Sequence, residues 1–386
     1  MAGIYLHIPF CKRLCAYCDF YKSARLRLLD DTLRAMHREL ELRHGELRDR
    51  RLRTLYFGGG TPSLCTPRQI GGLIDHACRL FGDAQPEEVT VEANPDDLDF
   101  DYLKALREAG VNRLSVGIQS FDDAELKFMN RRHTAGQAVR AVQEAQRAGF
   151  DNLTIDLIFG VPGFGGQTLR RNLAQAAALG VQHISAYHLT LEPGTAFGRR
   201  AARGELRPVE ERTSEEEFLE VHETLTAAGF EHYEVSNFAL PGFRARHNAA
   251  YWDGTEYLGI GPGAHSYDGA TRRWSTDTVE SYLGGGLRHE EERLTEHDRV
   301  NEWLMTRLRT ADGFLFEAFR ERFGERRAAR LKRDAGPCMQ SGALRDDGGR
   351  WHIPPERFLI SDDIIGTLFE SETDARAEDS ADGHKV

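Results

Sequence analysis

The sequence has few cysteines, no long apolar run and no surplus of positive charge. Its 386 residues carry 50 basic and 61 acidic side chains, which give a formal net charge of −11. A general nucleic-acid-binding surface needs a basic stripe to neutralise phosphates, so the composition argues against a nucleic-acid partner. No stretch approaches the roughly 20 apolar residues that span a bilayer. The first residues also lack the basic and apolar segments of a signal peptide. We therefore expect a cytoplasmic protein without a transmembrane segment.

Cysteine is too scarce for a disulfide framework, because such frameworks occur in short, cysteine-dense chains. Three of the six cysteines nevertheless lie within eight residues, in the spacing Cys11-x3-Cys15-x2-Cys18. In a reducing compartment, this crowding favours metal ligation over disulfide pairing. The other three are expected to be ordinary packed residues: Cys65, Cys78 and Cys338.

Short β-branched or aromatic runs alternate with amphipathic stretches over the first half of the chain. The predicted strands are Gly3–Ile8, Thr54–Phe57, Glu88–Ala93, Arg113–Gly117, Asn152–Leu157 and His183–Leu189. The predicted helices are Asp31–Glu46, Pro67–Leu80, Asp99–Ala109, Ala135–Ala148 and Gln167–Ala178. This alternation predicts an α/β fold of parallel βα units. Six units are fewer than the eight of a closed barrel, so we predict a partial (β/α)6 barrel.

Composition divides the chain into four predicted regions. Residues 1–230 would form the barrel, ending with a charged helix at Glu210–Ala228. Residues 231–295 form a connecting region rich in glycine, aromatic residues and histidine. Residues 296–370 are expected to form a smaller, mixed and mainly helical C-terminal domain with a short strand pair around Gly348–Ile353. Residues 371–386 are acidic and nearly devoid of large apolar side chains, so they are expected to be disordered.

The cysteine motif alone leaves two kinds of metal site open. Three thiolates in one loop cannot supply four ligands. A zinc site would take its fourth ligand from a distant histidine or cysteine. A [4Fe–4S] cluster would instead keep one iron open for an external chelating molecule. The spacing does not decide between them.

Polar residues at the ends of the other predicted strands bear on this choice. In parallel βα folds, ligands sit at the carboxyl ends of the strands. These ends carry, in order, Gly58-Gly59-Gly60-Thr61-Pro62, Glu92, Gln119 and Asp156, and Arg131 follows closely enough to reach the same rim.

The chemistry of these residues suits a molecule with an amino acid at one end and a nucleoside at the other. The glycine run lets backbone approach a ligand closely, and Arg131 suits a carboxylate. Glu92 and Asp156 suit ribose hydroxyls. A tight turn and ordinary ion pairs are the plainer interpretations of each residue alone. Their shared placement beside the cysteine loop favours S-adenosylmethionine (SAM), chelated to the open iron of a [4Fe–4S] cluster.

These segments resemble the radical-SAM proteins of the oxygen-independent coproporphyrinogen oxidase group, from about Gly3 to Phe369. The matching motifs are Tyr5-Leu-His-Ile-Pro-Phe-Cys11-x3-Cys15-x-Tyr17-Cys18-Asp19-Phe20, Gly58–Pro62, Val91–Pro95, Ser115–Phe121 and Asp156–Gly163. Within the group, the chain is most similar to the haem-chaperone branch. Phe20 stands where the oxidases have a further cysteine, and their N-terminal extension is missing. His247-Asn248-Ala-Ala-Tyr251-Trp252 resembles the haem-binding motif of that branch.

The resemblance implies a role for each matching position. Cys11, Cys15 and Cys18 would hold the cluster. Haem would be ligated by His247 and packed by Tyr251 and Trp252, with His265 as a weaker second candidate ligand. The predicted SAM contacts are Tyr5, Tyr17, Gly60, Thr61, Pro62, Glu92, Gln119, Arg131 and Asp156.

The function implied is that of a haem chaperone, which carries haem to apo-haem proteins such as respiratory cytochromes and lacks coproporphyrinogen oxidase activity. One alternative is an oxygen-independent coproporphyrinogen III dehydrogenase. Another is a radical-SAM methyltransferase that acts on haem. The sequence does not name the client. It is compatible with a homodimer and with peripheral membrane contact through a client.

Overall fold

The computed structural model describes residues 2–49, 51–82 and 85–371. The chain divides into two compact units. The first comprises the described residues of Met1–Glu231, Ser236–Ala250 and Thr255–Glu292. The second comprises those of His232–Val235, Tyr251–Gly254 and Arg293–Val386. Of the tail predicted to be disordered, residues 372–386 lie outside the described part.

The first unit is built on a mostly parallel sheet, and its six central strands confirm the six predicted ones. These strands lie in the sheet interior, and most of their side chains are buried. The strands lie side by side in chain order, each parallel to the next. Their bounds are β1 (Ala2–Ile8), β2 (Leu52–Gly59), β3 (Glu88–Ala93), β4 (Arg113–Gln119), β5 (Leu153–Phe159) and β6 (His183–His188).

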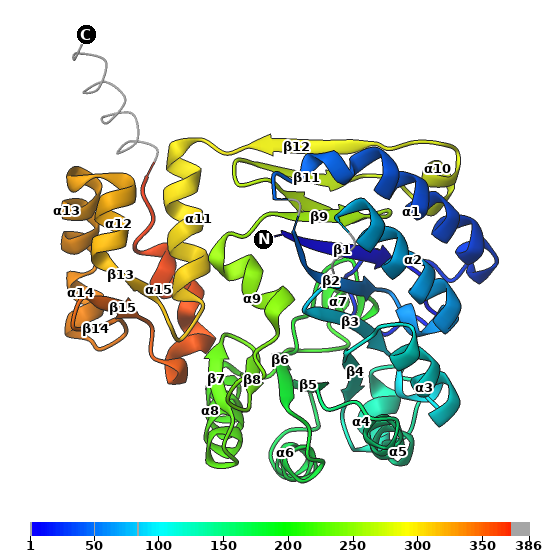
Figure 1. Ribbon diagram of the computed structural model, residues 1–386. Helices are drawn as coiled ribbons and strands as arrows, with labels where there is room; N and C mark the ends of the chain where they lie inside the picture. Colours follow the sequence, from blue (N-terminus) through cyan, green and yellow to red (C-terminus); the bar gives the residue numbers. More distant parts are fainter. Residues whose placement is uncertain (1, 50, 83–84, 372–386) are drawn as a thin grey trace. The chain divides into compact units, whose positions relative to one another are not determined.

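The helices that connect these strands lie along the outer side of the sheet (Figure 1). The five predicted helices are confirmed with ends that differ by three residues or fewer, and α4, which was not predicted, follows β4. Their bounds are α1 (Leu29–Arg43), α2 (Pro67–Leu80), α3 (Phe100–Glu108), α4 (Asp123–Phe128), α5 (Ala135–Arg147) and α6 (Gln167–Ala178). The predicted α/β partial barrel is therefore confirmed.

Local capping explains why two of these helices begin where they do. Thr66 accepts a hydrogen bond from the backbone of Gln69, whose side chain returns to the backbone of Thr66. Thr134 and Gln137 form the same reciprocal pair at the start of α5. Each pair satisfies two amide groups that the helix cannot satisfy itself.

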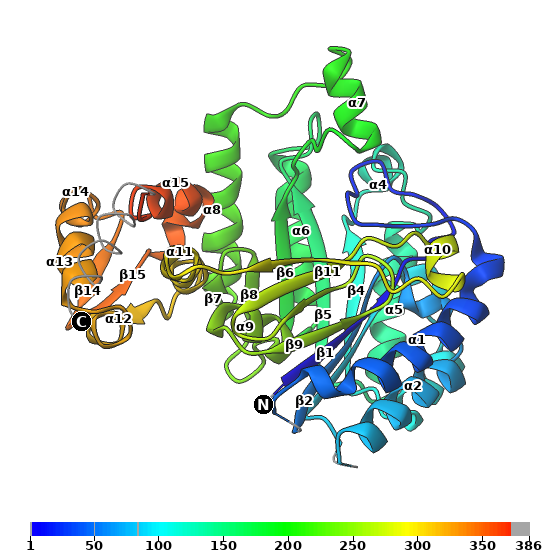
Figure 2. The same ribbon diagram turned by 90° about the horizontal axis from the view of Figure 1, so that it is seen from above.

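The sheet continues beyond the six predicted strands on both sides. Beside β1 it runs through β9, β10, β11 and β12, and beside β6 it continues with β8. Figure 2 shows β9 next to β1, to which it pairs in parallel. The added elements are β8 (Asn237–Ala239), α9 (Arg246–Asp253), β9 (Tyr257–Ile260), β10 (His265–Tyr267), β11 (Thr271–Ser275), α10 (Val279–Leu283) and β12 (His289–Arg293). In the chain, β6 is followed by α7 (Ala196–Ala202) and α8 (Glu211–Ala227) before β8 begins, and α8 is the charged helix predicted at Glu210–Ala228.

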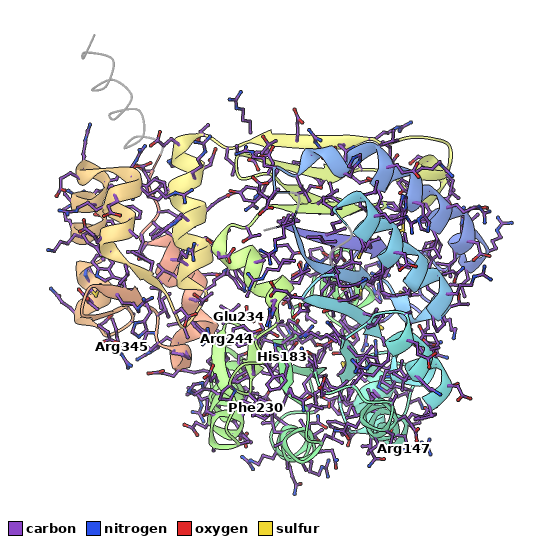
Figure 3. The ribbon with its side chains drawn as sticks, in the orientation of Figure 1. Arg147, His183, Phe230, Glu234, Arg244 and Arg345 are labelled. Atoms are coloured by element: carbon purple, nitrogen blue, oxygen red, sulfur yellow. The ribbon has the colours of Figure 1, made fainter. Side chains whose placement is uncertain are left out.

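The sheet of the first unit buries several polar side chains. His183 on β6 is fully buried and Arg113 on β4 is 1% exposed. Arg113 donates to Thr154 at 2.5 Å and to Thr90 at 3.5 Å. Figure 3 shows His183 among the strands, whereas Arg147 lies at the outer rim on α5. The interior of this sheet is therefore partly polar. Charged side chains are seldom buried unless they are hydrogen-bonded, as Arg113 is here.

The second unit is small and mainly helical, with an aromatic core. Trp303 contacts Phe314, Phe319 and Phe323, and Phe314 contacts Trp351. The predicted strand pair near Gly348–Ile353 is present as β14 and β15. The elements are β7 (Glu231–Glu234, at the boundary of the units), α11 (Glu296–Leu308), β13 (Phe314–Leu315), α12 (Phe316–Phe323), α13 (Glu325–Asp334), α14 (Gly336–Gln340), β14 (Arg345–Asp347), β15 (Arg350–His352) and α15 (Ser361–Gly366). Among the described residues of the whole chain, no helix combines the length and apolar character needed to cross a membrane.

Candidate functional site

A cavity of about 400 Å³ opens at the carboxyl ends of the central strands in the first unit. Parallel strands bring their carboxyl ends to one edge of the sheet, so side chains far apart in sequence meet there. The cavity collects ten of the twelve residues predicted to bind the cluster or SAM. These are Cys11, Cys15, Tyr17, Cys18, Gly60, Thr61, Glu92, Gln119, Arg131 and Asp156.

The three cysteines lie on the loop that follows β1, and all three thiols are free. The Cys11 sulfur accepts a hydrogen bond from the Thr61 hydroxyl at 3.5 Å. The Cys15 sulfur accepts one from Arg131 Nη1 at 3.3 Å. Burial raises the pKa of the Cys11 and Cys18 thiols. Thiolates here therefore require a nearby positive charge, which iron supplies.

A site for a single metal ion needs three or four ligand atoms close to one point, whereas the thiolates of a cluster site lie further apart. In the described part of the chain, no three histidine, cysteine or acidic side chains converge on a point that could hold a single metal ion. In a [4Fe–4S] cluster, each thiolate instead binds a different iron.

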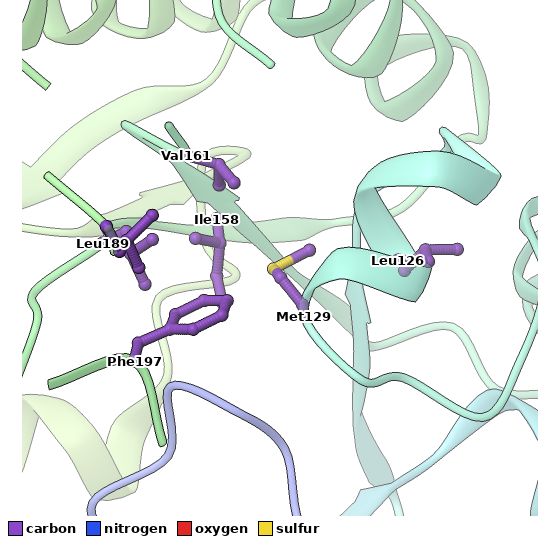
Figure 4. Packing of buried hydrophobic residues seen from close by; sticks show 7 residues of the cluster. Leu126, Met129, Ile158, Val161, Leu189 and Phe197 are labelled. Atoms are coloured by element: carbon purple, nitrogen blue, oxygen red, sulfur yellow. The ribbon is translucent and has the colours of Figure 1, made fainter. Parts of the chain in front are cut away.

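The cysteine loop rests on a buried hydrophobic cluster (Figure 4). Ala16 and Tyr17, between the second and third cysteines, pack against this cluster. The amide of Ala16 donates to the carbonyl of Met129 at 3.1 Å, and its carbonyl accepts from Phe197 at 2.9 Å. Protein contacts therefore fix the middle of the loop. The cluster consists of Leu126, Met129, Ile158, Val161, Leu189, Phe197 and Leu206.

Gly60 lies so close to the cysteine loop that only glycine fits. A Cβ at this position would lie 2.6 Å from the backbone nitrogen of Phe10 and 2.8 Å from the carbonyl oxygen of Ile8. The Gly60 amide donates to that same carbonyl at 2.9 Å. The triple-glycine segment thus joins the end of β2 to the start of the cysteine loop. The close approach predicted for it was to a ligand, and that stays a prediction.

Two buried carboxyl groups, Glu92 and Asp156, line the cavity. Burial raises the pKa of Glu92 to about 7 and that of Asp156 to about 6. Glu92 accepts from the Tyr56 hydroxyl at 2.8 Å and from the Gly59 amide at 3.1 Å. Asp156 accepts from the Ser115 hydroxyl at 3.5 Å. Further hydroxyl donors from a ligand would stabilise both carboxylates.

Arg131 is the basic side chain best placed to bind an anionic ligand group. Its Nη2 donates to Asn94 Oδ1 at 2.7 Å and to the carbonyl of Gly117. Its Nε is buried and has no hydrogen-bond partner among the described residues. An unpaired buried donor is costly, so this nitrogen favours an acceptor from a bound molecule. A ligand carboxylate meets that need.

Two predicted SAM contacts, Tyr5 and Pro62, and the four predicted haem contacts do not line the cavity, and their ligand contacts stay predictions. The Tyr5 hydroxyl forms a hydrogen bond with His7 Nδ1 at 3.1 Å. Pro62 begins a short 3-10 turn, Pro62–Leu64. His247 begins α9 near the amino ends of the strands, at the opposite end of the sheet from the cavity.

His247 is held firmly at that opposite end. Its side chain is 2% exposed, and its Nδ1 forms a hydrogen bond with the Thr54 hydroxyl at 2.8 Å. Its ring stacks on Tyr56 with 4.9 Å between centroids. The Glu88 carboxylate accepts the amides of Arg246 and His247, each at 2.9 Å, and so caps α9. Burial lowers the pKa of His247 to about 3.

The rest of the predicted haem motif is divided between the units. His247 belongs to the first unit, whereas Tyr251 and Trp252 belong to the second. His265, the weaker candidate, is exposed and stacks on Trp274 with 6.1 Å between ring centroids.

Sequence reasoning missed two residues that support the cavity. Asn94 joins Arg131 to Thr61, to whose hydroxyl it donates at 3.1 Å. It belongs to the segment Val91–Pro95, so its position next to Glu92 was the available signal. Tyr56 lies within a strand and resembles an ordinary core residue in sequence, so no local signal marks it.

Comparison with known proteins agrees with this fold. Residues 5–176 match the model of the Radical SAM superfamily, and residues 294–359 match the HemN C-terminal domain. The structure of the coproporphyrinogen III oxidase HemN from Escherichia coli shares the fold, with a TM-score of 0.80 at 22% identity. That alignment covers 95% of this chain and 90% of the oxidase chain. The fold and the three-cysteine loop thus define a radical SAM protein.

Sequence identity to curated relatives assigns the chain to one family within this superfamily. A protein named heme chaperone HemW from Lactococcus lactis is 37% identical over 364 residues, 94% of this chain and 95% of that relative. HemW of Escherichia coli is 34% identical over 316 residues, 80% of this chain and 82% of that relative. The chain belongs to the HemW family.

Proposed function

We propose that this protein is a haem chaperone that holds a [4Fe–4S] cluster and SAM and delivers haem to apo-haem proteins in the cytoplasm. The clients would be respiratory haem proteins such as cytochromes, and the protein would lack coproporphyrinogen oxidase activity. The observation that carries the proposal is the cavity in which three free thiols meet Glu92, Arg131 and Asp156. The name of the relatives supports the choice of haem as cargo.

The residues of the cavity would divide the work of binding. The thiolates of Cys11, Cys15 and Cys18 would hold the cluster, and Arg131 would bind the carboxylate of SAM. The glycine run would face the amino-acid end, while Glu92 and Asp156 would accept the ribose hydroxyls. Tyr17, Thr61 and Gln119 would complete the binding surface. With both groups bound, a reduced cluster would supply the electron that cleavage of a carbon–sulfur bond of SAM requires.

Phe20 bears on the choice between chaperone and oxidase. It follows the third cluster cysteine by two residues, where the oxidases resembled by this sequence have a further cysteine. Its side chain is 68% exposed and lines the cavity. Phenylalanine has no acid, base or nucleophilic group, so it cannot replace a cysteine in chemistry.

The test uses anaerobically reconstituted protein with SAM and a reductant. One sample receives coproporphyrinogen III and another receives haem together with an apo-cytochrome. We expect stable haem uptake, transfer to the acceptor and no porphyrin product. Formation of protoporphyrinogen IX would support the dehydrogenase and overturn the proposal. A methylated linear tetrapyrrole would do the same in favour of a methyltransferase. Metal analysis showing zinc without iron or labile sulfide would remove the basis of all three.

A further inference from the structure

Gln119 has an unusual backbone conformation. Its φ angle is 72°, and Asn130 is the only other non-glycine residue with a positive φ in residues 2–49, 51–82 and 85–371. Asparagine tolerates this left-handed region well, whereas a longer side chain such as glutamine seldom adopts it. The pairing of β4 with β5 also shifts register between Gly117 and Gln119. Such outliers persist only where the surrounding structure holds them.

The strained residue lies in the cavity. Gln119 lines the cavity beside Gly117 and Arg131 and is 8% exposed. The register shift and the left-handed turn set the direction of the chain where β4 ends, and therefore where the Gln119 amide points. A residue that relaxed to an ordinary conformation would move this amide.

A buried polar network lies directly behind Gln119. The Ser120 hydroxyl donates to Glu125 Oε2 at 2.5 Å, and Asn172 Nδ2 donates to the same oxygen at 3.0 Å. Asn172 Oδ1 accepts the backbone amide of Phe121 at 2.8 Å. Ser120 is fully buried, and Glu125 and Asn172 are each 3% exposed.

The network ties together three elements that are separate in sequence. Ser120 follows β4, Glu125 lies on α4 and Asn172 lies on α6. None of these three side chains lines the cavity. Burial raises the pKa of Glu125 to about 7, so the carboxyl group depends on both of its donors. A network satisfied on all sides fixes its members rigidly.

We propose that Asn172, through its hydrogen bonds to the Phe121 amide, Ser120 and Glu125, is a positioning residue that holds Gln119 in its left-handed conformation and so shapes the cavity for SAM. This inference rests on the proposed function for the identity of the ligand. Asn172 lies on α6, which follows β5 in the chain, and it accepts the amide of Phe121, two residues after Gln119. The positive φ at Gln119 and the fixed amide at Phe121 are thus two ends of one constraint.

A double-mutant cycle tests the proposal. Glycine adopts a positive φ without a Cβ penalty, so Gln119→Gly removes the need for an anchor. In the wild-type background, we expect Asn172→Ala to weaken SAM binding at least tenfold, measured by equilibrium dialysis on reconstituted protein with unchanged iron and sulfide content. In the Gln119→Gly background, SAM binding is already weak, and Asn172→Ala should change it less than twofold.

A buried residue on the same helix provides the matched control. Leu173 is 1% exposed, so Leu173→Ala should lower the melting temperature and leave SAM binding within twofold of wild type. If Asn172→Ala also leaves SAM binding within twofold, the network is structural only and the proposal is overturned. Should Asn172→Ala fail to fold, Ser120→Ala removes one bond from the same network and takes its place.

Thermal unfolding of the protein without cofactors gives a second readout. Gln119→Gly should raise the melting temperature, and Asn172→Ala should lower it less in the Gln119→Gly background than in wild type. Additive effects would show that Asn172 does not hold Gln119 and would overturn the proposal. A wild-type protein that holds the cluster yet does not bind SAM would overturn the proposed function and the ligand named here. In that case, the coupling in stability still decides whether Asn172 holds Gln119.

Discussion

The ring of His247 stacks on the ring of Tyr56 with 4.9 Å between centroids, and the Tyr56 hydroxyl donates to Glu92 at 2.8 Å. One tyrosine therefore connects the predicted haem ligand at the amino ends of the strands to the predicted SAM contact at their carboxyl ends. A porphyrin cannot reach an imidazole that is 2% exposed. Haem ligation by His247 thus requires the start of α9 to leave its present position.

Weakening the cap of α9 should speed haem uptake. Glu88 accepts the amides of Arg246 and His247, one on each carboxylate oxygen. Glu88→Gln replaces one of these oxygens with an amide nitrogen that cannot accept, so one backbone amide loses its partner. We expect several-fold faster haem uptake in stopped-flow absorbance and a lower melting temperature. Glu87→Gln is the control, because Glu87 is exposed and its carboxylate pairs with the side chains of Arg53 and Arg246. Equal uptake rates for the two variants would mean that opening of α9 does not limit the rate of haem uptake.

The buried imidazole of His247 should make stability depend on pH. Its pKa falls from 6.5 to about 3 on folding, so below pH 6.5 the unfolded chain binds a proton that the folded chain does not. The contribution of His247 to the free energy of unfolding is therefore fully present above pH 6.5 and is lost as the pH falls toward 3. Between pH 7.5 and 5.5 this loss is about 1.4 kcal/mol. Urea unfolding should show the difference between wild type and His247→Asn, and parallel pH profiles would contradict it.

Glu92 should lower stability while supporting SAM binding. Its pKa rises from 4.5 to about 7 on folding, so its contribution to stability falls as the pH rises through that window. At pH 8, Glu92→Gln should raise the free energy of unfolding by on the order of 1–3 kcal/mol. The gain should vanish near pH 4.5, and SAM binding should weaken at least tenfold. A variant that binds SAM as wild type does would remove Glu92 from the binding residues.

The geometry of Arg131 should matter more than its charge. Arg131→Lys keeps the charge and loses the planar set of donors that matches a carboxylate. We expect SAM binding to weaken by roughly 10- to 100-fold, measured by calorimetry on reconstituted protein. Arg132→Lys is the matched control, since Arg132 pairs with Asp96 and Asp97 and does not line the cavity. Similar losses in both variants would point to a general effect of this loop.

Cluster content should separate the two kinds of cysteine. Cys15→Ser removes a predicted ligand, so iron, labile sulfide and the brown absorbance should fall to background after reconstitution. Cys65→Ser is the control, because Cys65 is buried outside the cavity at 1% exposure. Cluster loss in the Cys65 variant alone would contradict the ligand assignment.

The sequence predicted the central strands because short β-branched and aromatic runs alternate with amphipathic stretches, and two of those helices carry local caps. Thr66 and Thr134 are such caps, and each acts within four residues of chain. The strands from β9 to β12 were missed because they are short. β9 owes its place to pairing with β1, far away in sequence, and β10, β11 and β12 extend the sheet from β9. The helix α9 was missed because its cap, Glu88, comes from β3.

The features of the site also separate into those that the sequence predicts and those that depend on contacts between distant segments. Strand ends meet in any parallel sheet, so Glu92, Gln119 and Asp156 could be expected to share one rim. The burial of His247 could not be expected, since it depends on Thr54 and Tyr56, which pack against it only in the folded chain. The strain at Gln119 is invisible in sequence for the same reason.

The cysteine loop is docked on Met129 and Phe197 by backbone hydrogen bonds that involve no iron. We therefore expect the middle of the loop to keep its shape if a bound cluster is lost to oxygen. Such damage would remove the cluster and leave its binding loop folded. Repair would then require only a new supply of iron and sulfide, without refolding of the chain.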